Sequence, residues 1–364
     1  MDKFGYMEKF GYEQLCFFHD KYTGLKAITC IHNTVLGPSL GGTRFWNYAN
    51  EEDAVEDVLR LARGMTYKSS LAGLALGGGK SVIIGDYREL RKDPIRREAF
   101  WRAFGRYIEG LNGRYITAED IGTTTQDMVY VNMETTNVVG LPGRSGDPSP
   151  YTSLGAYKSI QACCEHVYGN SSVEGRTVTV QGVGQTGYYL CKLLYDNGAK
   201  LIVSDVSQER IDRVVEEFGA KVVDVNDIYS QECDIYSPCA LGATVNDETI
   251  PQLKCKIVCG VANNVLKDAP VHAKALQDRG ITYAPDYLAN AGGVINVSYE
   301  RAEGGYNEEA ALRDIDRIYI RMKDILKISE ETGQLTYETA DKLAEERIKS
   351  VQNIRSILTT GRRS

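Results

Sequence analysis

The chain has 364 residues, enough for about two domains. Its composition, 43% hydrophobic and 25% charged, is typical of a folded globular protein and excludes wholesale disorder. The net charge of -7, without a long basic run, argues against nucleic acid as a partner.

Neither the N-terminus nor any apolar stretch predicts export or a membrane span. No run reaches the ~18–20 apolar residues of a membrane helix, and the first residues lack the apolar core of a signal peptide. The nine cysteines are scattered, with none in a CxxC pair, and predict reduced thiols. The four histidines have no ligand spacing and predict no metal site. We therefore expect a cytoplasmic protein that does not contact a membrane.

The first 120 residues alternate strand and helix patterns. Alternating apolar residues predict strands, and apolar residues at helical spacing predict amphipathic helices. The predicted elements are strands 14–18 and 25–31, helix 51–65, a glycine-rich loop 73–80, strand 81–86, helix 97–111 and strand 114–117.

The densest cluster of glycine and proline spans 140–150, and we place a domain junction there. Beyond it, alternating strands and helices predict a parallel sheet flanked by helices. The predicted strands are 176–181, 201–205, 220–224, 233–236, 256–260 and 281–284, and the predicted helices are 186–197, 207–217 and 270–279. The tail from 308 to 358 predicts two long helices.

A GxGxxG motif lies between strand 176–181 and a helix. These glycines allow a tight turn and bring a pyrophosphate close to the helix N-terminus. Asp205 ends the next strand, about 20 residues beyond the motif, where a carboxylate binds the adenosine ribose. An ionised Asp205 would repel a 2′-phosphate, so we predict NAD rather than NADP, a preference that Arg210 could soften. The residues predicted to bind the cofactor here are Gly182, Gly184, Gln185, Thr186, Gly187 and Asp205.

Two lysines lie near a glycine-rich bend: Lys68 follows helix 51–65, and Lys80 ends the triple-glycine loop. One ammonium can hold a substrate carboxylate, and the other can act as a base when it is desolvated or beside a like charge. A single lysine is usually a solvated surface charge, but triple glycine beside it indicates a close approach. A P-loop is excluded because Leu74 replaces its first glycine and the loop precedes a strand.

With these motifs in order, the chain resembles the amino acid dehydrogenases that act on glutamate, leucine, phenylalanine or valine, and it follows the leucine-type pattern. The resemblance covers nearly the whole chain. It rests on the blocks 36–44, 64–68, 77–80, 117–120, 238–242, 262–264 and 290–293, together with the dinucleotide motif.

The resemblance implies reversible oxidative deamination of an L-amino acid to its 2-oxo acid and ammonia, with NAD as hydride acceptor. It implies that Lys68 binds the substrate carboxylate, Lys80 activates water as a general base, and Asp120 exchanges protons with the amino group. A catalytically silent NAD-binding sensor is the alternative from another class. Such a protein has no chemical need for these three residues together.

The resemblance also assigns residues around the nicotinamide and the substrate. Those implied at the nicotinamide are Thr152, Ala240, Asn263 and Asn290, and those implied at the substrate are Leu40, Gly41, Gly42, Met65, Ala118, Val294 and Val297. The side-chain pocket is apolar, which disfavours glutamate because an unpaired buried carboxylate is costly. Ala118 and Val294 replace the smaller residues of phenylalanine-specific relatives. We expect leucine, valine or isoleucine as substrate, with a phenylalanine-type enzyme as the alternative.

The resemblance implies an α/β fold with two domains. It also implies a homo-oligomer, commonly an octamer. Residues 1–145 would form a substrate-binding and oligomerisation domain, joined by returning C-terminal helices at 335–364. Residues 146–334 would form a Rossmann-type, doubly wound dinucleotide-binding domain. Two features depart from the family pattern. Gly187 stands where alanine is common, a change expected to preserve packing, and the basic segment 88–97 is predicted to be a solvated surface, with an oligomer contact or anion site as the alternative.

Overall fold

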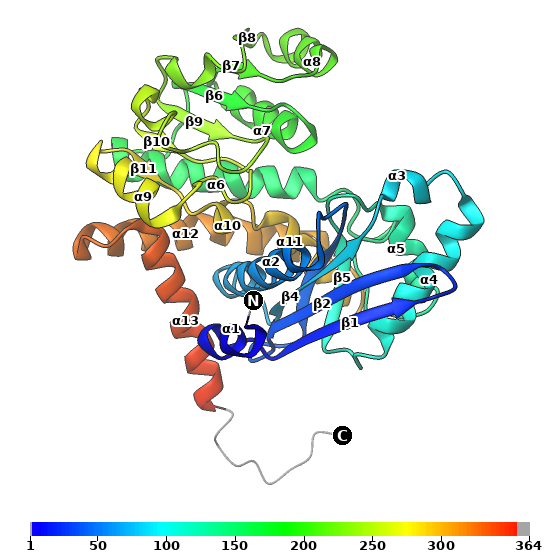
Figure 1. Ribbon diagram of the computed structural model, residues 1–364. Helices are drawn as coiled ribbons and strands as arrows, with labels where there is room; N and C mark the ends of the chain where they lie inside the picture. Colours follow the sequence, from blue (N-terminus) through cyan, green and yellow to red (C-terminus); the bar gives the residue numbers. More distant parts are fainter. Residues whose placement is uncertain (1, 355–364) are drawn as a thin grey trace. The chain divides into compact units, whose positions relative to one another are not determined.

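The computed structural model describes residues 2–354 and divides them into two compact units. The N-terminal unit consists of residues 2–146, 300–306 and 344–354, and the central unit consists of 147–299 and 307–343. The first boundary between them lies inside the segment of glycine and proline at 140–150. Each unit has its own sheet (Figure 1).

The N-terminal unit is built on a mixed sheet with the strand order β1-β2-β4-β3-β5. β2 is antiparallel to both β1 and β4, whereas β3 is parallel to β4 and β5. The strands are β1 (Gln14–Asp20), β2 (Leu25–Asn33), β3 (Ser39–Trp46), β4 (Gly77–Ile84) and β5 (Tyr115–Glu119), and the helices are α1 (Lys3–Phe10), α2 (Glu51–Leu71), α3 (Tyr87–Leu90), α4 (Pro94–Glu109) and α5 (Thr125–Asn132). The predicted strands 14–18 and 25–31 are confirmed as β1 and β2, which form an antiparallel pair.

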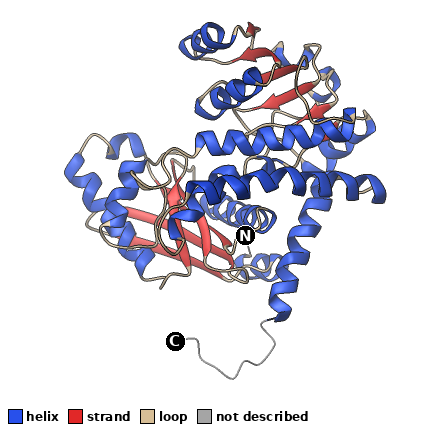
Figure 2. Ribbon diagram, turned by 180° about the vertical axis from the view of Figure 1, so that it is seen from behind, coloured by secondary structure: helices blue, strands red, loops and turns tan. Residues whose placement is uncertain are grey.

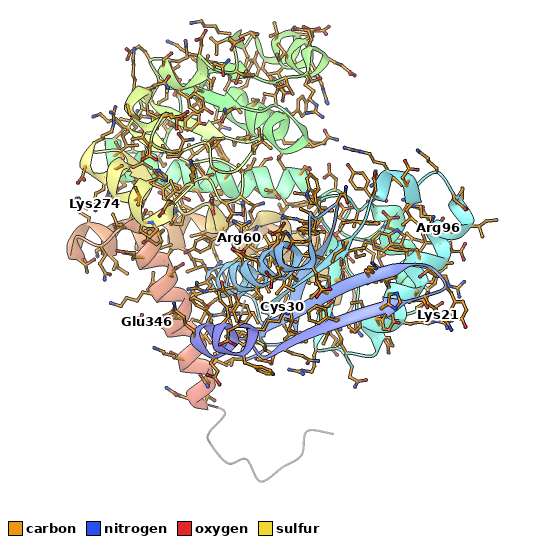
Figure 3. The ribbon with its side chains drawn as sticks, in the orientation of Figure 1. Lys21, Cys30, Arg60, Arg96, Lys274 and Glu346 are labelled. Atoms are coloured by element: carbon orange, nitrogen blue, oxygen red, sulfur yellow. The ribbon has the colours of Figure 1, made fainter. Side chains whose placement is uncertain are left out.

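Helices cover both faces of this sheet, so the strands bury side chains on alternate positions toward each face. The core on the α2 side contains Ile28, Cys30, Val58, Leu59 and Val82, with Cys30 labelled in Figure 3. The core on the α4 side contains Ala27, Ile31, Ile83, Phe100 and Phe104.

The glycine-rich segment at 73–80, predicted as a loop, is wrong at its C-terminal end, because β4 already begins at Gly77. Close packing explains glycine in this strand. A Cβ on Gly77 would lie 1.8 Å from the Asn33 carbonyl oxygen, and one on Gly78 would lie 2.0 Å from the Thr66 backbone nitrogen of α2. The glycines therefore bring α2 and the neighbouring strand against β4.

The sequence prediction also ended α2 too early, at residue 65. The helix continues through Gly64 to Leu71, so Lys68 lies in its last turn and does not follow it. Ser69, Ser70 and Leu71 are buried, and tertiary packing of this end outweighs the local signal of glycine. β3, α1 and α5 were not predicted as elements. In the basic segment 88–97 most residues are exposed, as predicted.

The central unit is built on a parallel sheet with the order β11-β10-β9-β6-β7-β8. Counted from β6, this is the 3-2-1-4-5-6 order of a doubly wound dinucleotide-binding fold, as predicted. Figure 2 shows these strands bordered by helices. The strands are β6 (Thr177–Gln181), β7 (Lys200–Ser204), β8 (Lys221–Val222), β9 (Ile235–Pro238), β10 (Ile257–Val258) and β11 (Thr282–Tyr283).

The helices of this unit include two long C-terminal ones, as predicted. They are α6 (Ser149–Tyr168), α7 (Gln185–Asp196), α8 (Gln208–Phe218), α9 (Ala269–Asp278), α10 (Asp286–Ala289), α11 (Gly292–Ser298), α12 (Glu308–Thr332) and α13 (Thr336–Ile354), with short 3-10 turns η1 (Ile228–Ser230), η2 (Ile250–Gln252) and η3 (Tyr299–Arg301). α13 passes from the central unit to the N-terminal unit at Ala344. Residues 355–364, the end of the predicted C-terminal segment, lie outside the described chain.

α6 was not predicted, and it begins inside the proline-rich segment. Proline is tolerated in the first turn, where the N–H group has no partner in the helix, and Ser149 is followed by such a proline. Within the described residues, the nine cysteines all have free thiols. No helix of residues 2–354 is long and apolar enough to cross a membrane.

Gly78→Ala should lower the free energy of unfolding by about 3 kcal/mol, because its Cβ would overlap the backbone of α2. Gly64→Ala is the matched control: no atom lies within 4 Å of its Cβ, and alanine favours the helix by about 0.5–1 kcal/mol. Urea denaturation of the two variants measures both effects. Equal stability of Gly78→Ala and the native chain would contradict this explanation of β4.

Candidate active site

The neighbouring strands β3, β4 and β5 bring the candidate residues of the N-terminal unit together. These strands are parallel neighbours, and the register pairs Leu40 with Ile116 and Gly42 with Ala118. Because side chains alternate along a strand, alternate residues of each strand share the face that α2 covers. The residues placed on this face are Leu40, Gly42, Arg44, Lys80 and Ala118, with Asp120 just beyond the end of β5.

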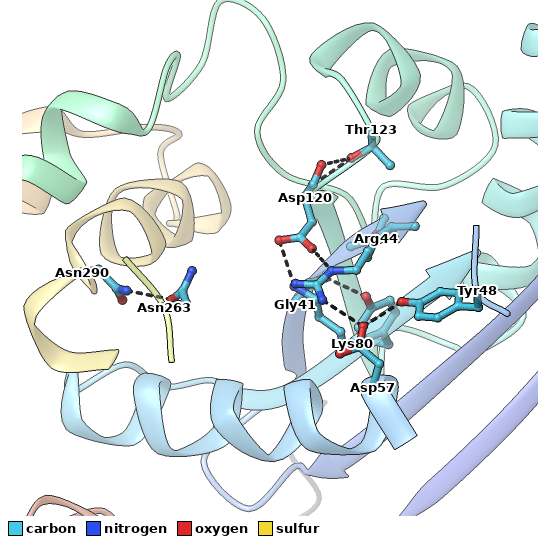
Figure 4. Close-up of polar contacts among 12 residues, drawn as sticks. Gly41, Arg44, Tyr48, Asp57, Lys80, Asp120, Thr123, Asn263 and Asn290 are labelled. Carbon is cyan, nitrogen blue, oxygen red and sulfur yellow. Dashed lines mark hydrogen bonds and ion pairs between the residues drawn. The ribbon is translucent and has the colours of Figure 1, made fainter. Parts of the chain in front are cut away.

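A buried ion pair lies at the centre of this group. Lys80 is only 5% exposed, and its Nζ lies 3.1 Å from Oδ1 of Asp120. The other carboxylate oxygen, Oδ2, accepts a hydrogen bond from Nε of Arg44 at 3.1 Å. Figure 4 shows Asp120 between these two cations. The structure thus brings the predicted general base and the predicted proton-exchanging acid into direct contact.

The two cations keep Asp120 ionised. Burial by itself would raise the pKa of this carboxyl, but the charges of Lys80 and Arg44 and their hydrogen bonds outweigh it and lower the pKa below its usual value. At neutral pH the carboxylate therefore carries its charge and can accept a proton or hold a cationic amine.

Gly41 and Gly42, predicted to lie at the substrate, are both required by packing in the described chain. A Cβ on Gly42 would lie 2.5 Å from the Glu119 carbonyl oxygen and 2.9 Å from Cβ of Asp120. A Cβ on Gly41 would lie 1.8 Å from the Gly79 carbonyl oxygen. Glycine in β3 therefore makes the space in which Asp120 reaches across the sheet.

Lys68 and Met65 come from α2, the helix that covers this face of the sheet. Both side chains are half-buried. Thr66, between them in sequence, packs against β4 at Gly78 and hydrogen-bonds His32 at 2.7 Å. This contact fixes the last turns of α2, and with them the backbone of Lys68, on the sheet.

Sequence reasoning missed three polar residues of this site. Arg44 lies in a block used for the family resemblance, but no role was given to it. Its Nη1 lies 2.9 Å from Oδ2 of Asp57 on α2, and the hydroxyl of Tyr48 donates to the same oxygen at 2.7 Å. The alternation of Leu40, Gly42 and Arg44 along one strand was the signal that could have placed Arg44 at the site. We call Lys80, Asp120, Arg44, Asp57 and Tyr48 the charge cluster.

In the central unit, the glycine motif turns directly after β6, at the point where the strand order reverses. Gly182 has a positive φ of 93°, and its Cβ would lie 2.5 Å from Cβ of Ala240. At Gly187 a Cβ would lie 2.1 Å from the Gly182 carbonyl oxygen. The close packing expected at Gly187 is present, and in this backbone it leaves no room for a Cβ.

Gly184 differs from its two neighbours in the motif. Its φ is -63°, and the nearest atom to a Cβ at this position would be Nη1 of Arg210 at 3.7 Å, an ordinary contact. Nothing within the described chain requires glycine at this position. The backbone at Gly184 is thus open to an external group, and a dinucleotide phosphate is the kind of group that the motif predicts there. The N-terminus of α7 beside it has no side-chain cap, so the N–H groups at Gln185 and Thr186 can bind a phosphate.

Asp205 is held in place for a further acceptor role. Its Oδ2 accepts from the Val183 N–H at 2.8 Å and its Oδ1 from the Ser207 N–H at 2.9 Å. A carboxylate has about four acceptor positions, so acceptor capacity remains for a ribose. The carboxylate lines a cavity of about 540 Å³ together with Gly182, Gly184, Arg210, Ala240 and Leu241. These residues fit the adenosine half of a dinucleotide.

Other predicted nicotinamide residues lie at the ends of neighbouring elements. Nδ2 of Asn290 donates to Oδ1 of Asn263 at 2.7 Å, so these two amides are brought together (Figure 4). Oγ1 of Thr152 would lie 2.4 Å from a Cβ on Gly293, which places Thr152 against the start of α11. α11 also carries Val294, half-buried, and Val297, buried.

Comparisons with known proteins match two parts of the chain. A model described as Glu/Leu/Phe/Val dehydrogenase, dimerisation domain, matches residues 13–137. A second model, described as Glutamate/Leucine/Phenylalanine/Valine dehydrogenase, matches residues 203–355.

Individual relatives match over nearly their whole length. The chain is 55% identical to leucine dehydrogenase of Bacillus subtilis, over 98% of this chain and 96% of the relative. It is 53% identical to leucine dehydrogenase of Thermoactinomyces intermedius, over 100% of this chain and 98% of that relative. The solved structure of L-tryptophan dehydrogenase from Nostoc punctiforme matches with a TM-score of 0.84 at 41% identity, covering 96% of this chain and 99% of that one.

Asp120→Asn should destabilise the fold by about 3 kcal/mol at neutral pH, because it leaves buried Lys80 and half-buried Arg44 without their shared anion. A carboxyl with a lowered folded-state pKa stabilises above its unfolded pKa, about 3.9, and this contribution is lost as pH falls through the lower folded value. Urea denaturation between pH 3 and 7 should therefore show a constant difference near neutrality that shrinks in acid. A difference independent of pH would contradict the ionised state of Asp120.

Gly184→Ala should retain the stability of the native chain and lose at least about tenfold in dinucleotide affinity, about 1.4 kcal/mol, because its Cβ enters space that only a ligand needs. Titration with NADH followed by fluorescence, beside thermal unfolding, separates the two effects. Gly187→Ala is the control and should lose stability, since its Cβ meets the Gly182 carbonyl. An unchanged NADH affinity of Gly184→Ala would contradict the binding of a phosphate at this turn.

Proposed function

Because the chain belongs to the Glu/Leu/Phe/Val dehydrogenase family, and is thus an amino acid dehydrogenase, we propose that it oxidatively deaminates branched-chain L-amino acids with NAD. The reaction is reversible, with L-leucine the first substrate and L-valine and L-isoleucine also accepted, and gives the 2-oxo acid and ammonia. The observation that carries this proposal is the 55% identity to a leucine dehydrogenase over 98% of the chain.

Binding and orientation of the substrate fall to the N-terminal unit. In the proposal the Lys68 ammonium, in the last turn of α2, pairs with the substrate carboxylate. Asp120, held ionised by its two cations, faces the substrate amino group and exchanges protons with it. A carboxylate beside the nitrogen also stabilises the positive charge that develops when the amine becomes an iminium.

Lys80 is the proposed general base for the addition of water to the iminium. It is buried, so water around it is limited, and its ammonium is hydrogen-bonded to Asp120. Lys80 can act as a base only after Nζ has lost a proton, and the contact with Asp120 gives that proton a path to the carboxylate. The bound dinucleotide supplies the hydride acceptor at the substrate α-carbon.

Substrate choice follows from apolar residues. Leu40 is 2% exposed on the face shared with Lys80, and Ala118 lies beside Gly42 in the next strand. In the central unit, α11 offers Val294 and Val297. None of these side chains can pair with a substrate carboxylate, which supports an aliphatic side chain over glutamate. Leucine, valine and isoleucine differ by about one methylene, worth ~1–3 kcal/mol, so overlapping activity is expected.

The family takes a nicotinamide dinucleotide, and we propose NAD for this chain. Asp205 is nearly buried and already bonded to two backbone N–H groups, so its carboxylate stays where the 2′-position of the ribose would lie. Nη1 of Arg210 is 3.8 Å away, but this arginine is 57% exposed and its charge is screened by solvent.

We propose that the two units have the separate roles expected from the sequence. The N-terminal unit would bind substrate and carry the oligomer contacts, with the end of α13 returning to it, and the central unit would bind the dinucleotide. The matched dimerisation domain means that the chain forms an oligomer, and we propose an octamer. The free thiols support a cytoplasmic site of action.

The proposal predicts NADH formation when the protein and NAD are mixed with branched-chain L-amino acids at alkaline pH. The rate should be higher with L-leucine, L-valine or L-isoleucine than with L-phenylalanine or L-glutamate, and much lower when NADP replaces NAD. Lys80→Ala is the control and should abolish turnover while NADH binding in the central unit persists. Activity dominated by phenylalanine would overturn the substrate assignment, and NAD binding without turnover on any of the five would favour the sensor alternative.

A further inference from the structure

The charge cluster alternates in sign across three strands and a helix. Nζ of Lys80 on β4 lies 3.1 Å from Asp120, and Nε of Arg44 on β3 lies 3.1 Å from the same carboxylate. Nη1 of Arg44 then lies 2.9 Å from Asp57 on α2, whose Oδ2 also accepts from Tyr48 at 2.7 Å. Figure 4 shows this chain of contacts. The charges of the two cations and the two anions balance. Removal of one charged side chain therefore leaves the cluster with a net charge of known sign.

We propose that Arg44, held by Asp57 and Tyr48, is a positioning residue that fixes Asp120 between two cations and so sets the pH range in which Lys80 and Asp120 move protons. This inference rests on the proposed function, because it concerns the proton transfers of that reaction. Arg44 acts through Asp120 and is not itself given contact with the substrate.

Geometry gives Asp57 and Tyr48 their part. A free guanidinium grips a carboxylate with two parallel N–H groups, and such a grip on Asp120 would compete with Lys80. Here Asp57 binds Nη1 and so orients the guanidinium, while Nε donates to Oδ2 of Asp120 and Oδ1 contacts Lys80. Burial raises the pKa of Tyr48 above its usual value, and the hydrogen bond to Asp57 raises it further, so the hydroxyl stays protonated and donates.

Other charged groups near the cluster leave this balance intact. Arg60 on α2 contacts Asp57 at 3.3 Å but is 59% exposed, and Figure 3 labels it on α2. Glu119 beside Asp120 accepts a hydrogen bond from Thr125. Lys68 on α2 is unchanged in all the variants tested below, so its charge does not differ between them. Burial raises the pKa of Tyr115 above its usual value, so this phenol on β5 is neutral.

The test is the pH profile of kcat/KM for L-leucine oxidation in Arg44→Met and Asp57→Asn. Loss of the Arg44 charge makes the cluster more negative, so its proton is released at higher pH, and the acidic limb should move up by about one pH unit. Loss of the Asp57 charge makes the cluster more positive, and the acidic limb should move down. A merely structural role predicts slower or less stable enzymes without shifts of opposite sign.

Two further variants keep the test decisive. Arg44→Lys retains the charge and should keep the acidic limb near that of the native enzyme, while its rate falls because one ammonium cannot serve both carboxylates in the same geometry. Arg97→Met is the matched control. It removes another half-buried arginine of this unit, 2.7 Å from Asp127 on α5, and should lower stability without moving the profile.

The outcomes separate the two proposals. A native enzyme that oxidises no amino acid overturns the proposed function itself. A native enzyme that is active, with Arg44→Met and Asp57→Asn that leave the profile unmoved or move it in the same direction, overturns the role of Arg44 alone. If Arg44→Met does not fold, the downward shift of Asp57→Asn with an unmoved Arg44→Lys supports the inference, and an unmoved Asp57→Asn contradicts it.

Discussion

The contact between Lys80 and Asp120 is the constraint on which the N-terminal unit depends. A lysine that is 5% exposed carries a large desolvation cost unless an anion lies beside it. Asp120 supplies that anion from the far side of β3, and it reaches Lys80 because Gly42 has no side chain between them. One buried ion pair therefore depends on three features of this unit: the strand order, the positions of the glycines and the packing of α2 on β4.

Glycine also allows close approach in the central unit. Two glycines of the motif allow the chain to pack closely on itself, and a third leaves open space beside the backbone. Gly182 and Gly187 let the turn pack against Ala240 and against itself, whereas the space at Gly184 is open, and in our proposal a phosphate occupies it. Asp205 is fixed by two backbone N–H groups at the end of β7. An open position at the carboxyl ends of parallel strands is where a doubly wound fold binds a dinucleotide.

Much of this could be predicted from the sequence, because strand alternation and the GxGxxG context are local signals. Lys68, Lys80 and Asp120 were found by type and by resemblance. The contact between Lys80 and Asp120 was not predicted, since it depends on the register of three strands. Arg44, Tyr48 and Asp57 are near one another in sequence, but their contacts depend on how α2 packs on β3. β4 was predicted as a loop at Gly77 because the packing that makes glycine suitable in that strand comes from Asn33 and α2, distant in sequence.

The charge state of Asp120 links the fold to the proposed chemistry, and it can be observed directly. Isotope-edited infrared spectroscopy of the enzyme labelled at aspartate carboxyl groups, with Asp120→Asn as the reference, distinguishes an ionised carboxylate from a carboxylic acid. We predict that Asp120 is ionised at neutral pH and remains so below the ordinary pKa of about 3.9 for aspartate. A protonated Asp120 at neutral pH would contradict the buried ion pair and the proton transfers built on it.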